Sequence, residues 1–262
     1  MPYIAGLDIG SAQSKAVIMQ DRTLLAYSTR PTEGNFTQSA EDVFKTALEK
    51  ANLSYASIDL IGALGLGAAF ISYPFTKISD ISCQSRGTHF LFPTVRTLIE
   101  VGNQASKIIK VTAVGKVSDC LVSDRCAAGS SRVLQIIAKV LKIDLEDMGA
   151  LSLNSTHPVK FTTGCAVFLE TEAISRVAEG MSKENIVAGL HHTLAARISA
   201  MAQRMRLEGD YVITGGGAKD GGLVKLMEAK MGQRFLVPEE PLITGAIGAA
   251  LIASERDNLN AR

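Results

Sequence analysis

The chain carries the same local pattern twice, and this repeat is the feature that most restricts its fold. An apolar run at residues 3–8 leads into a glycine and serine turn, and two more strand-like runs follow at 15–20 and 23–28. The pattern restarts at 97–101, with a turn at 102–104 and strand-like runs at 107–112 and 116–122. Apolar runs of this length, bounded by turn residues, predict strands. Each half therefore predicts a β-meander whose first turn is large enough for a phosphate group.

Segments with helical spacing follow each meander. The expected helices are 41–52, 131–141, 168–179, 183–205, 218–231 and 244–254, and further strands are expected at 58–64 and 211–214. The pattern predicts an internally duplicated, two-lobed α/β fold, and such folds hold a ligand in the cleft between the copies. We expect an N-terminal lobe at 1–94, a C-terminal lobe at 95–243 and a last helix within 244–262 that packs back on the N-terminal lobe.

Composition excludes several classes of protein. Of the 262 residues 47% are hydrophobic and 20% charged, which is typical of an ordered globular chain. A net charge of +1 provides no basic field for nucleic acid. No apolar run reaches the roughly 20 residues that cross a bilayer, and the N-terminus lacks the basic region of an export signal. We expect a cytoplasmic protein with neither nucleic acid nor membrane as a partner.

The turn after the first strand has the composition of an anion-binding turn. Asp8 ends the strand and is expected to hold Mg²⁺ through water or to orient an attacking water. Gly10 lets the backbone approach an anion closely, and Ser11, Ser14 and Lys15 offer donors to phosphate oxygens. Taken alone, Asp-x-Gly-Ser also fits an ordinary tight turn, because glycine and serine are common in turns.

Recurrence strengthens the interpretation of that turn. Gly102, Asn103 and Gln104 occupy the same place in the second meander. A third glycine turn precedes a predicted helix, where free N–H groups and the helix dipole favour a nucleotide. Its residues are Gly215, Gly216, Gly217, Ala218 and Lys219. The alternative for this third turn is a flexible connection from strand to helix.

Two of the four cysteines lie just ahead of helix-like stretches. Cys126 opens Cys-Ala-Ala-Gly-Ser-Ser and Cys165 opens Cys-Ala-Val-Phe, so small residues surround both sulfur atoms. Thiolates bind iron, and a helix N-terminus favours the thiolate form. Because one chain supplies only two such positions, a four-ligand cluster requires a second copy and predicts a site that bridges subunits. The alternative is that both are small buried apolar residues. Cys120, in a predicted strand, is expected to pack in the core, and Cys83 has no derived role.

The order of motifs along nearly the whole chain resembles one protein family. The motifs are Asp-Ile-Gly-Ser at 8–11, Cys-x-x-Arg-Gly at 83–87, Val-Gly-x-Gln-x-Ser-Lys at 101–107, Cys-Ala-Ala-Gly at 126–129, Cys-x-Val-Phe-x-Glu-x-Glu at 165–172, Gly-Gly-x-Ala-Lys at 215–219 and Gly-Ala-Ile-Gly-Ala-Ala at 245–250. This set resembles the ATPase activators of 2-hydroxyacyl-CoA dehydratases and the related ATPase subunits of benzoyl-CoA reductases.

The resemblance implies an actin/hexokinase/Hsp70-like fold and an ATP-hydrolysing electron-transfer activator that binds ATP or ADP with Mg²⁺. It implies one [4Fe-4S] cluster shared by two subunits, with Cys126 and Cys165 as ligands, in a homodimer or a heterodimer with a related subunit. An acyl-CoA dehydratase or reductase component would receive one low-potential electron, and a ferredoxin or flavodoxin would donate it. On this basis Asp8 and Gln104 are the candidate catalytic residues, and Gly129 and Ser130 join the glycine turns as candidate nucleotide contacts.

The second turn departs from the family pattern, which commonly reads Asp-Ile-Gly-Gly-Gln-Asp there. Ala105 stands where the last acidic residue is expected, so hydrolysis by this chain could be slow. Two other functions stay open: a small-molecule kinase of the same fold and, because of Ala105, a non-hydrolysing regulatory subunit of a heterodimeric activator.

A few residues outside the motifs carry expectations of their own. His191 and His192 cannot form an i, i+4 ligand pair, because adjacent helical positions point in different directions, and both are expected at the surface or an interface. Glu170 and Glu172 are expected in the first turn of a helix, where they suit its dipole. Gly87 is a candidate hinge residue.

Overall fold

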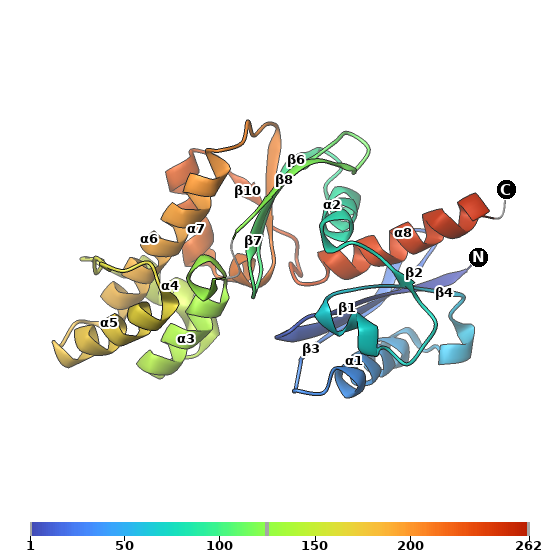
Figure 1. Ribbon diagram of the computed structural model, residues 1–262, viewed down its shortest axis with the longest axis horizontal. Coiled ribbons are helices and arrows are strands. Elements are labelled where there is room, and N and C mark those ends of the chain that lie inside the picture. Colours follow the sequence, from blue (N-terminus) through green and yellow to red (C-terminus); the bar gives the residue numbers. More distant parts are fainter. Residues whose placement is uncertain (1, 124–125, 261–262) are drawn as a thin grey trace. The chain divides into compact units, whose positions relative to one another are not determined.

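The computed structural model describes residues 2–123 and 126–260, which form two compact units (Figure 1). Unit 1 comprises Met1–Val95, Val111–Ser118 and Leu242–Arg262, and unit 2 comprises Arg96–Lys110 and Asp119–Pro241. The division expected from the sequence did not place the hairpin tip at 111–118 with the N-terminal segment.

Unit 1 is a five-stranded sheet with helices on both faces. Its elements are β1 (Tyr3–Ile9), β2 (Gln13–Gln20), β3 (Thr23–Pro31), α1 (Phe36–Ala51), η1 (Tyr55–Ser57), β4 (Leu60–Leu64), η2 (Leu66–Phe70), β5 (Thr76–Lys77), α2 (Asp80–Leu91) and α8 (Thr244–Asn260). The strand order is β3-β2-β1-β4-β5. The strands β1, β2 and β3 form the predicted antiparallel meander, and β4 pairs parallel to β1.

Alternation along β1 separates the two faces of this sheet. Ala5, Leu7 and Ile9 pack in one apolar cluster with α1, whereas Ile4 packs with α8. Successive strand residues point to opposite faces. Asp8 has the parity of Ile4, so it lies on the α8 side of the sheet, at the carboxyl end of its strand.

Helix α8 packs so closely on its neighbours that glycine is required at the contacts. In Figure 1 it lies beside α2. A Cβ built on Gly248 would overlap the carbonyl oxygen of Cys83 and lie 2.7 Å from its Cα. Gly87, inside α2, meets the carbonyl oxygen of Thr244 in the same way. The packing of α2 against α8 therefore explains Gly87 better than a hinge does.

We expect Gly248→Ala to lower the free energy of unfolding by about 1–3 kcal/mol. This loss is expected even though alanine stabilises a helix interior by ~1 kcal/mol relative to glycine. The added methyl group must separate two helix backbones. Urea unfolding measures the effect, and Gly221→Ala is the matched control, because a Cβ at Gly221 meets no atom within 4 Å. Equal stability of Gly248→Ala and the wild type would contradict this account of the crossing.

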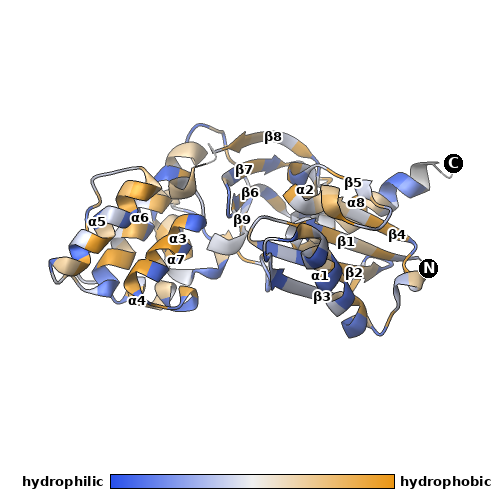
Figure 2. Cartoon of the chain, turned by 60° about the horizontal axis from the view of Figure 1, so that its bottom comes forward, coloured by the Kyte–Doolittle hydropathy of each residue, from blue (hydrophilic) through white to orange (hydrophobic). Residues whose placement is uncertain are grey.

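Unit 2 combines a second five-stranded sheet with a group of helices. Its elements are β6 (Val95–Val101), β7 (Ser106–Val111), β8 (Val117–Val122), η3 (Ala127–Gly129), α3 (Arg132–Leu141), η4 (Leu145–Asp147), α4 (Met148–Leu153), α5 (Ala166–Ala178), α6 (Lys183–Ala202), β9 (Asp210–Thr214), η5 (Gly216–Lys219), α7 (Gly221–Met231) and β10 (Phe235–Leu236). In Figure 2 the helices α3, α5, α6 and α7 lie together and carry many apolar residues. Their apolar faces share one core cluster.

The two sheets have the same topology. The order in unit 2 is β10-β9-β6-β7-β8. Written in the same direction, the order in unit 1 is β5-β4-β1-β2-β3, so β6 corresponds to β1 and β9 corresponds to β4. The duplication expected from the sequence is therefore present in the strand order itself.

Two helices were not predicted from the sequence, α2 and α4. In the described part of the chain, no helix is both long and apolar enough to cross a membrane.

Candidate functional site

The first candidate turn joins β1 to β2 in unit 1. Asp8 and Lys15 are directly opposed in the β1–β2 register, and Lys15 Nζ donates to Asp8 Oδ2 at 2.9 Å. Both side chains are nearly buried, with 10% and 12% of their surface exposed. The N–H of Gly10 donates to the carbonyl oxygen of Gln13 at 3.0 Å, and a Cβ on Gly10 would lie 2.8 Å from that oxygen. The turn thus holds one carboxylate and one ammonium group beside Gly10, where a larger residue would crowd the carbonyl oxygen of Gln13.

The two serines of this turn differ in their placement. Ser14 is fully buried, and its Oγ lies 2.9 Å from Oγ1 of Thr32, which in turn donates to the carbonyl oxygen of Gly10. Ser14 therefore braces the turn from within. Ser11 is exposed and is the serine of this turn whose side chain a solvent-borne anion can reach.

The second candidate turn, in unit 2, reproduces the first. Glu100 and Lys107 are opposed in the β6–β7 register and form an ion pair, each with 13% or less of its side chain exposed. Gly102 N–H donates to the carbonyl oxygen of Ala105 at 3.2 Å, as Gly10 does to Gln13. Glu100 is thus the counterpart of Asp8, and Ala105 is the counterpart of Gln13. Sequence reasoning overlooked Glu100 and Lys107, although their seven-residue spacing equals that of Asp8 and Lys15.

The segment after η3 is tied to the second turn. Ser130 Oγ donates to the carbonyl oxygen of Asn103 at 2.9 Å, and Ser106 Oγ donates to that of Gly129 at 2.7 Å. Gln135 Nε2 donates to Asn103 Oδ1 at 3.3 Å. Gly129, Ser130 and Asn103, three residues expected to contact a nucleotide, therefore lie together.

The glycine turn 215–217 also lies against the second turn. Gly215 has a φ of +82°, and a Cβ there would lie 2.6 Å from the carbonyl oxygen of Val101 and 3.3 Å from the nitrogen of Gly102. Lys219, two residues beyond the turn, pairs with Glu240 at 2.8 Å. Unit 1 has a counterpart: Gly65 has a φ of +93° and abuts the carbonyl group of Ile9. Positive φ and close backbone approach both require glycine at these positions.

The two candidate cluster cysteines occupy different local structures. Cys165 is exposed at the N-cap of the 13-residue helix α5, as the sequence predicted. Cys126 is half-buried and caps only the three-residue η3, since α3 begins at Arg132. The expectation that both sulfur atoms lie at α-helix N-termini is thus wrong for Cys126. The elements η3 and α5 contact each other, so the two cysteines begin neighbouring elements of unit 2.

The remaining two cysteines differ in burial: Cys120 is exposed and Cys83 is buried. Cys120 is exposed on β8, at the edge of its sheet, so the expected core packing is wrong. Cys83 is buried inside α2, where burial, and then the charges of Asp80 and Asp8, raise the pKa of its thiol. This shift favours the protonated thiol, whereas the thiolate is the form that binds metal. Among the described residues, no group of three or more His, Cys, Asp and Glu side chains could hold a metal ion.

Residues around Cys165 and in α6 also differ from expectation. Glu172 lies beyond the first turn of α5 and accepts from Thr162 N–H at 3.0 Å and from Arg176 at 3.2 Å. His191 is fully buried, and its Nε2 lies 2.8 Å from Asp220 Oδ2, whereas His192 is exposed. The expected surface position is therefore wrong for His191.

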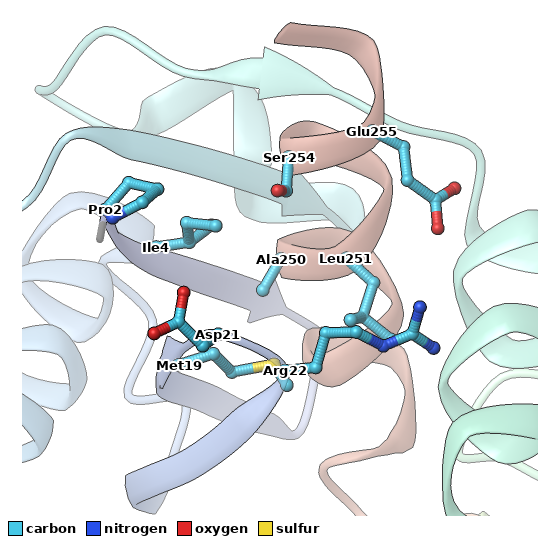
Figure 3. Close-up of a pocket in the computed structure, with 9 residues that line it drawn as sticks. All are labelled: Pro2, Ile4, Met19, Asp21, Arg22, Ala250, Leu251, Ser254 and Glu255. Atoms are coloured by element: carbon cyan, nitrogen blue, oxygen red, sulfur yellow. The ribbon is translucent and has the colours of Figure 1, made fainter. Parts of the chain in front are cut away.

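A cavity of about 520 Å³ in unit 1 contains none of the candidate residues. Figure 3 shows Arg22 of the β2–β3 turn extending toward Leu251 of α8, whereas Asp21 lies on the side of Pro2 and Ile4. The cavity lies at the amino end of β1, whereas Asp8 lies at the carboxyl end. We therefore place the candidate site at the turns and not at this cavity.

The repeated sheet order and the repeated turn, with its acid, glycine and lysine, define an actin- and hexokinase-like fold. A ROK family glucokinase from Streptomyces griseus shares this fold at a TM-score of 0.59 and 15% identity, covering 97% of this chain and 99% of that one. The fold class expected from the sequence is confirmed.

Within this class, the chain belongs to the BadF/BadG/BcrA/BcrD ATPase family, which it matches over residues 5–253. It is 36% identical over 251 residues to the 2-hydroxyisocaproyl-CoA dehydratase activator of Clostridioides difficile, covering 96% of this chain and 94% of that protein. The structure of that activator with bound ADPNP matches at a TM-score of 0.93 and 35% identity, covering 99% and 97% of the two chains. One of the subunits of benzoyl-CoA reductase from Thauera aromatica is 31% identical over 274 residues, covering 100% of this chain and 96% of that protein. The family resemblance found in the motifs is confirmed.

Proposed function

We propose that this chain is an ATP-hydrolysing iron–sulfur activator that passes a low-potential electron to an acyl-CoA dehydratase or reductase. The observation that carries the proposal is the position of Cys126 and Cys165. Both sulfur-bearing residues reach the surface on contacting elements of the same unit as the second turn. The names of the relatives, which are activators of acyl-CoA dehydratases and a component of a reductase, support this reading.

The two duplicated turns would handle the nucleotide. Gly10, Ser11, Lys15 and Gly102 would offer backbone and side-chain donors to phosphate oxygens. Asp8 and Glu100 would hold Mg²⁺ through water or orient the lytic water, together with Gln104. The glycine turn 215–217, with Ala218 and Lys219, would receive the adenosine.

The second turn keeps one carboxylate, although Ala105 lacks the last acidic residue of the family pattern. Ala105 corresponds to Gln13 of the first turn, which is not acidic either, and Glu100 supplies the carboxylate at the place of Asp8. This geometry favours hydrolysis by the chain itself over a purely regulatory role. We therefore retain ATP turnover in the proposal.

The cysteines fit a [4Fe-4S] cluster shared by two subunits. Cys165 is exposed, Cys126 is half-buried, and the neighbouring residues Ala127, Gly164 and Ala166 are small. Two ligands per chain make four in a dimer, which is the usual number of thiolates for such a cluster. When bound, the cluster supplies a one-electron carrier whose potential depends on nearby charge, hydrogen bonds and exposure.

Apolar side chains surround this position and suit contact with another protein. Val167 and Phe168, which follow Cys165 on α5, are 66% and 62% exposed, and Ile174 is 54% exposed. Contiguous exposed apolar residues are typical of interaction surfaces. We propose that α5 contributes to contact with a second subunit or with the acyl-CoA enzyme, and that a ferredoxin or flavodoxin donates the electron in the cytoplasm.

Anaerobic purification followed by iron, sulfide and ATPase assays tests the proposal. We expect about two iron and two sulfide per chain, as one four-iron cluster per dimer requires, together with phosphate release from MgATP in the absence of any small-molecule acceptor. A colourless protein that releases ADP only with a small-molecule substrate would instead indicate a kinase. Nucleotide binding without turnover would indicate a regulatory subunit.

A further inference from the structure

We propose that the buried pair of His191 and Asp220 is a positioning contact that couples the glycine turn 215–217 to the segment carrying Cys165, through helix α6. The proposal rests on the proposed function in treating that turn as nucleotide-binding and Cys165 as a cluster ligand. All the residues concerned belong to unit 2.

The pair is polar in a place where packing alone calls for apolar residues. His191 is 0% exposed, and its Nε2 lies 2.8 Å from Oδ2 of Asp220, which is 7% exposed. Within the described ranges, neither ring nitrogen of His191 makes a hydrogen bond of acceptable geometry, and neither does Asp220 Oδ2, so the two side chains meet as a close polar contact. Burying an unpartnered polar atom lowers the free energy of unfolding, and an apolar side chain of similar size would not carry this penalty. Stability therefore does not explain the histidine.

Asp220 joins this contact to the glycine turn. Its N–H donates to the carbonyl oxygen of Gly217 at 3.2 Å. Its Oδ1 accepts from Leu223 N–H at 3.0 Å and so caps helix α7. A displacement of the turn must therefore move the carboxylate that faces His191.

The opposite side of α6 holds the chain that leads to Cys165. Gly189 precedes His191 by two positions, about 200° around the helix at 100° per residue, and a Cβ there would overlap the carbonyl oxygen of Val159. Asn185 Oδ1 accepts from Ser155 Oγ at 2.8 Å and from His157 N–H at 3.1 Å.

Two further contacts complete this attachment. Val159 N–H donates to the carbonyl oxygen of Asn185 at 2.9 Å. Near the other end of α6, Arg197 donates to the carbonyl oxygen of Gly164, the residue just before Cys165. The segment 155–165 is thus attached to α6 at three positions along the helix, at Asn185, Gly189 and Arg197.

A single rigid element therefore connects the two places. A helix of 20 residues moves as a body when one contact on it shifts, and α6 also contacts η3, which begins after Cys126. The pair of His191 and Asp220 transmits the position of the glycine turn to α6, and α6 sets the position of the Cys165 segment.

Hydrogen exchange on the full-length protein, with and without a non-hydrolysable ATP analogue, tests this coupling independently of iron content. In the wild type we expect the analogue to change the exchange rate of amides in 155–165 by about 5-fold or more, the lower end of typical coupling between sites. In His191→Leu we expect that change to shrink below about 2-fold, while amides in 215–223 still respond. His192→Leu is the matched control, since His192 is adjacent but exposed.

A second variant acts from the other side of the helix. Asn185→Ala removes the side-chain attachment of residues 155–157 and leaves the pair of His191 and Asp220 intact. Because the contacts of Val159 and Gly164 with α6 remain, it should weaken the response most at amides 155–157, without weakening nucleotide binding. The proposal is overturned if His191→Leu or Asn185→Ala keeps the wild-type response, or if the wild type shows none in 155–165. Iron content and ATP turnover of the wild type report separately on the proposed function, so a failure of either idea can be recognised.

Discussion

Replacing Asp8 with asparagine is expected to lower kcat for ATP hydrolysis by about 10²–10³-fold, the range found on removing one oxyanion-hole donor that stabilises a transition state. Asparagine keeps the size of the side chain and can still accept a hydrogen bond from Lys15. What it loses is the negative charge that would hold Mg²⁺ or orient the lytic water. Phosphate release at saturating MgATP measures the change.

Asp21→Asn is the matched control for this variant. Asp21 lies in the β2–β3 turn with a φ of +48°, a conformation that asparagine tolerates well, and it is exposed. Thermal unfolding of Asp8→Asn must be checked, because Lys15 keeps a nearly buried charge with a weakened partner. If a folded Asp8→Asn protein hydrolyses ATP at the wild-type rate, Asp8 has no catalytic role.

The duplication extends the same argument to Glu100. Because Glu100 pairs with Lys107 as Asp8 does with Lys15, Glu100→Gln should also slow hydrolysis. Unchanged turnover in Glu100→Gln would restrict catalysis to the first turn. It would also indicate that the second turn, which has Ala105 in place of an acidic residue, takes no part in hydrolysis.

The strands were predictable because their signal is local. Continuous or alternating apolar residues bounded by glycine turns identified the strands of both meanders to within a few residues. Gly10 and Gly102 marked the turns between the first and second strands. The recurrence of these turns, more than any single motif, indicated the duplicated fold.

Helix α2 was missed because its stability comes from packing. Its sequence, Asp-Ile-Ser-Cys-Gln-Ser-Arg-Gly-Thr-His-Phe-Leu, has little amphipathic periodicity and contains a glycine in its interior. The helix is stabilised by the close approach of Cys83 and Gly87 to α8, which is distant in sequence. No local pattern contains that information.

The site was predictable in part for the same reason. A sequence shows that His191 and His192 are adjacent on a helix but not which side of it faces the core, so the contact of His191 with Asp220 was invisible. The serines after Cys126 also delay the start of α3, which leaves that cysteine on a short turn. In contrast, the pairing of Glu100 with Lys107 could have been inferred by applying the first turn's spacing to the second.

Cysteine replacement is expected to have the other large effect. Cys165→Ser and Cys126→Ser should each reduce bound iron to below about a tenth of the wild-type content, because soft thiolates select iron–sulfur clusters and a serine hydroxyl does not replace them. In a symmetric dimer one substitution removes two ligands at once. Iron and sulfide analysis, with the visible absorption spectrum of anaerobically prepared protein, measures the loss.

Cys120→Ser is the matched control, since Cys120 is the other exposed cysteine and lies on the edge strand β8. It should retain the wild-type iron content and colour. Cys83 offers no such comparison, because it is buried against α8 and its replacement disturbs the packing of α2. Brown colour retained in both Cys126→Ser and Cys165→Ser would place the cluster elsewhere and leave the exposed apolar face of α5 as an interaction surface without a metal. Loss of colour in Cys120→Ser alone would move the ligand to the edge of the second sheet, away from the segment that α6 holds.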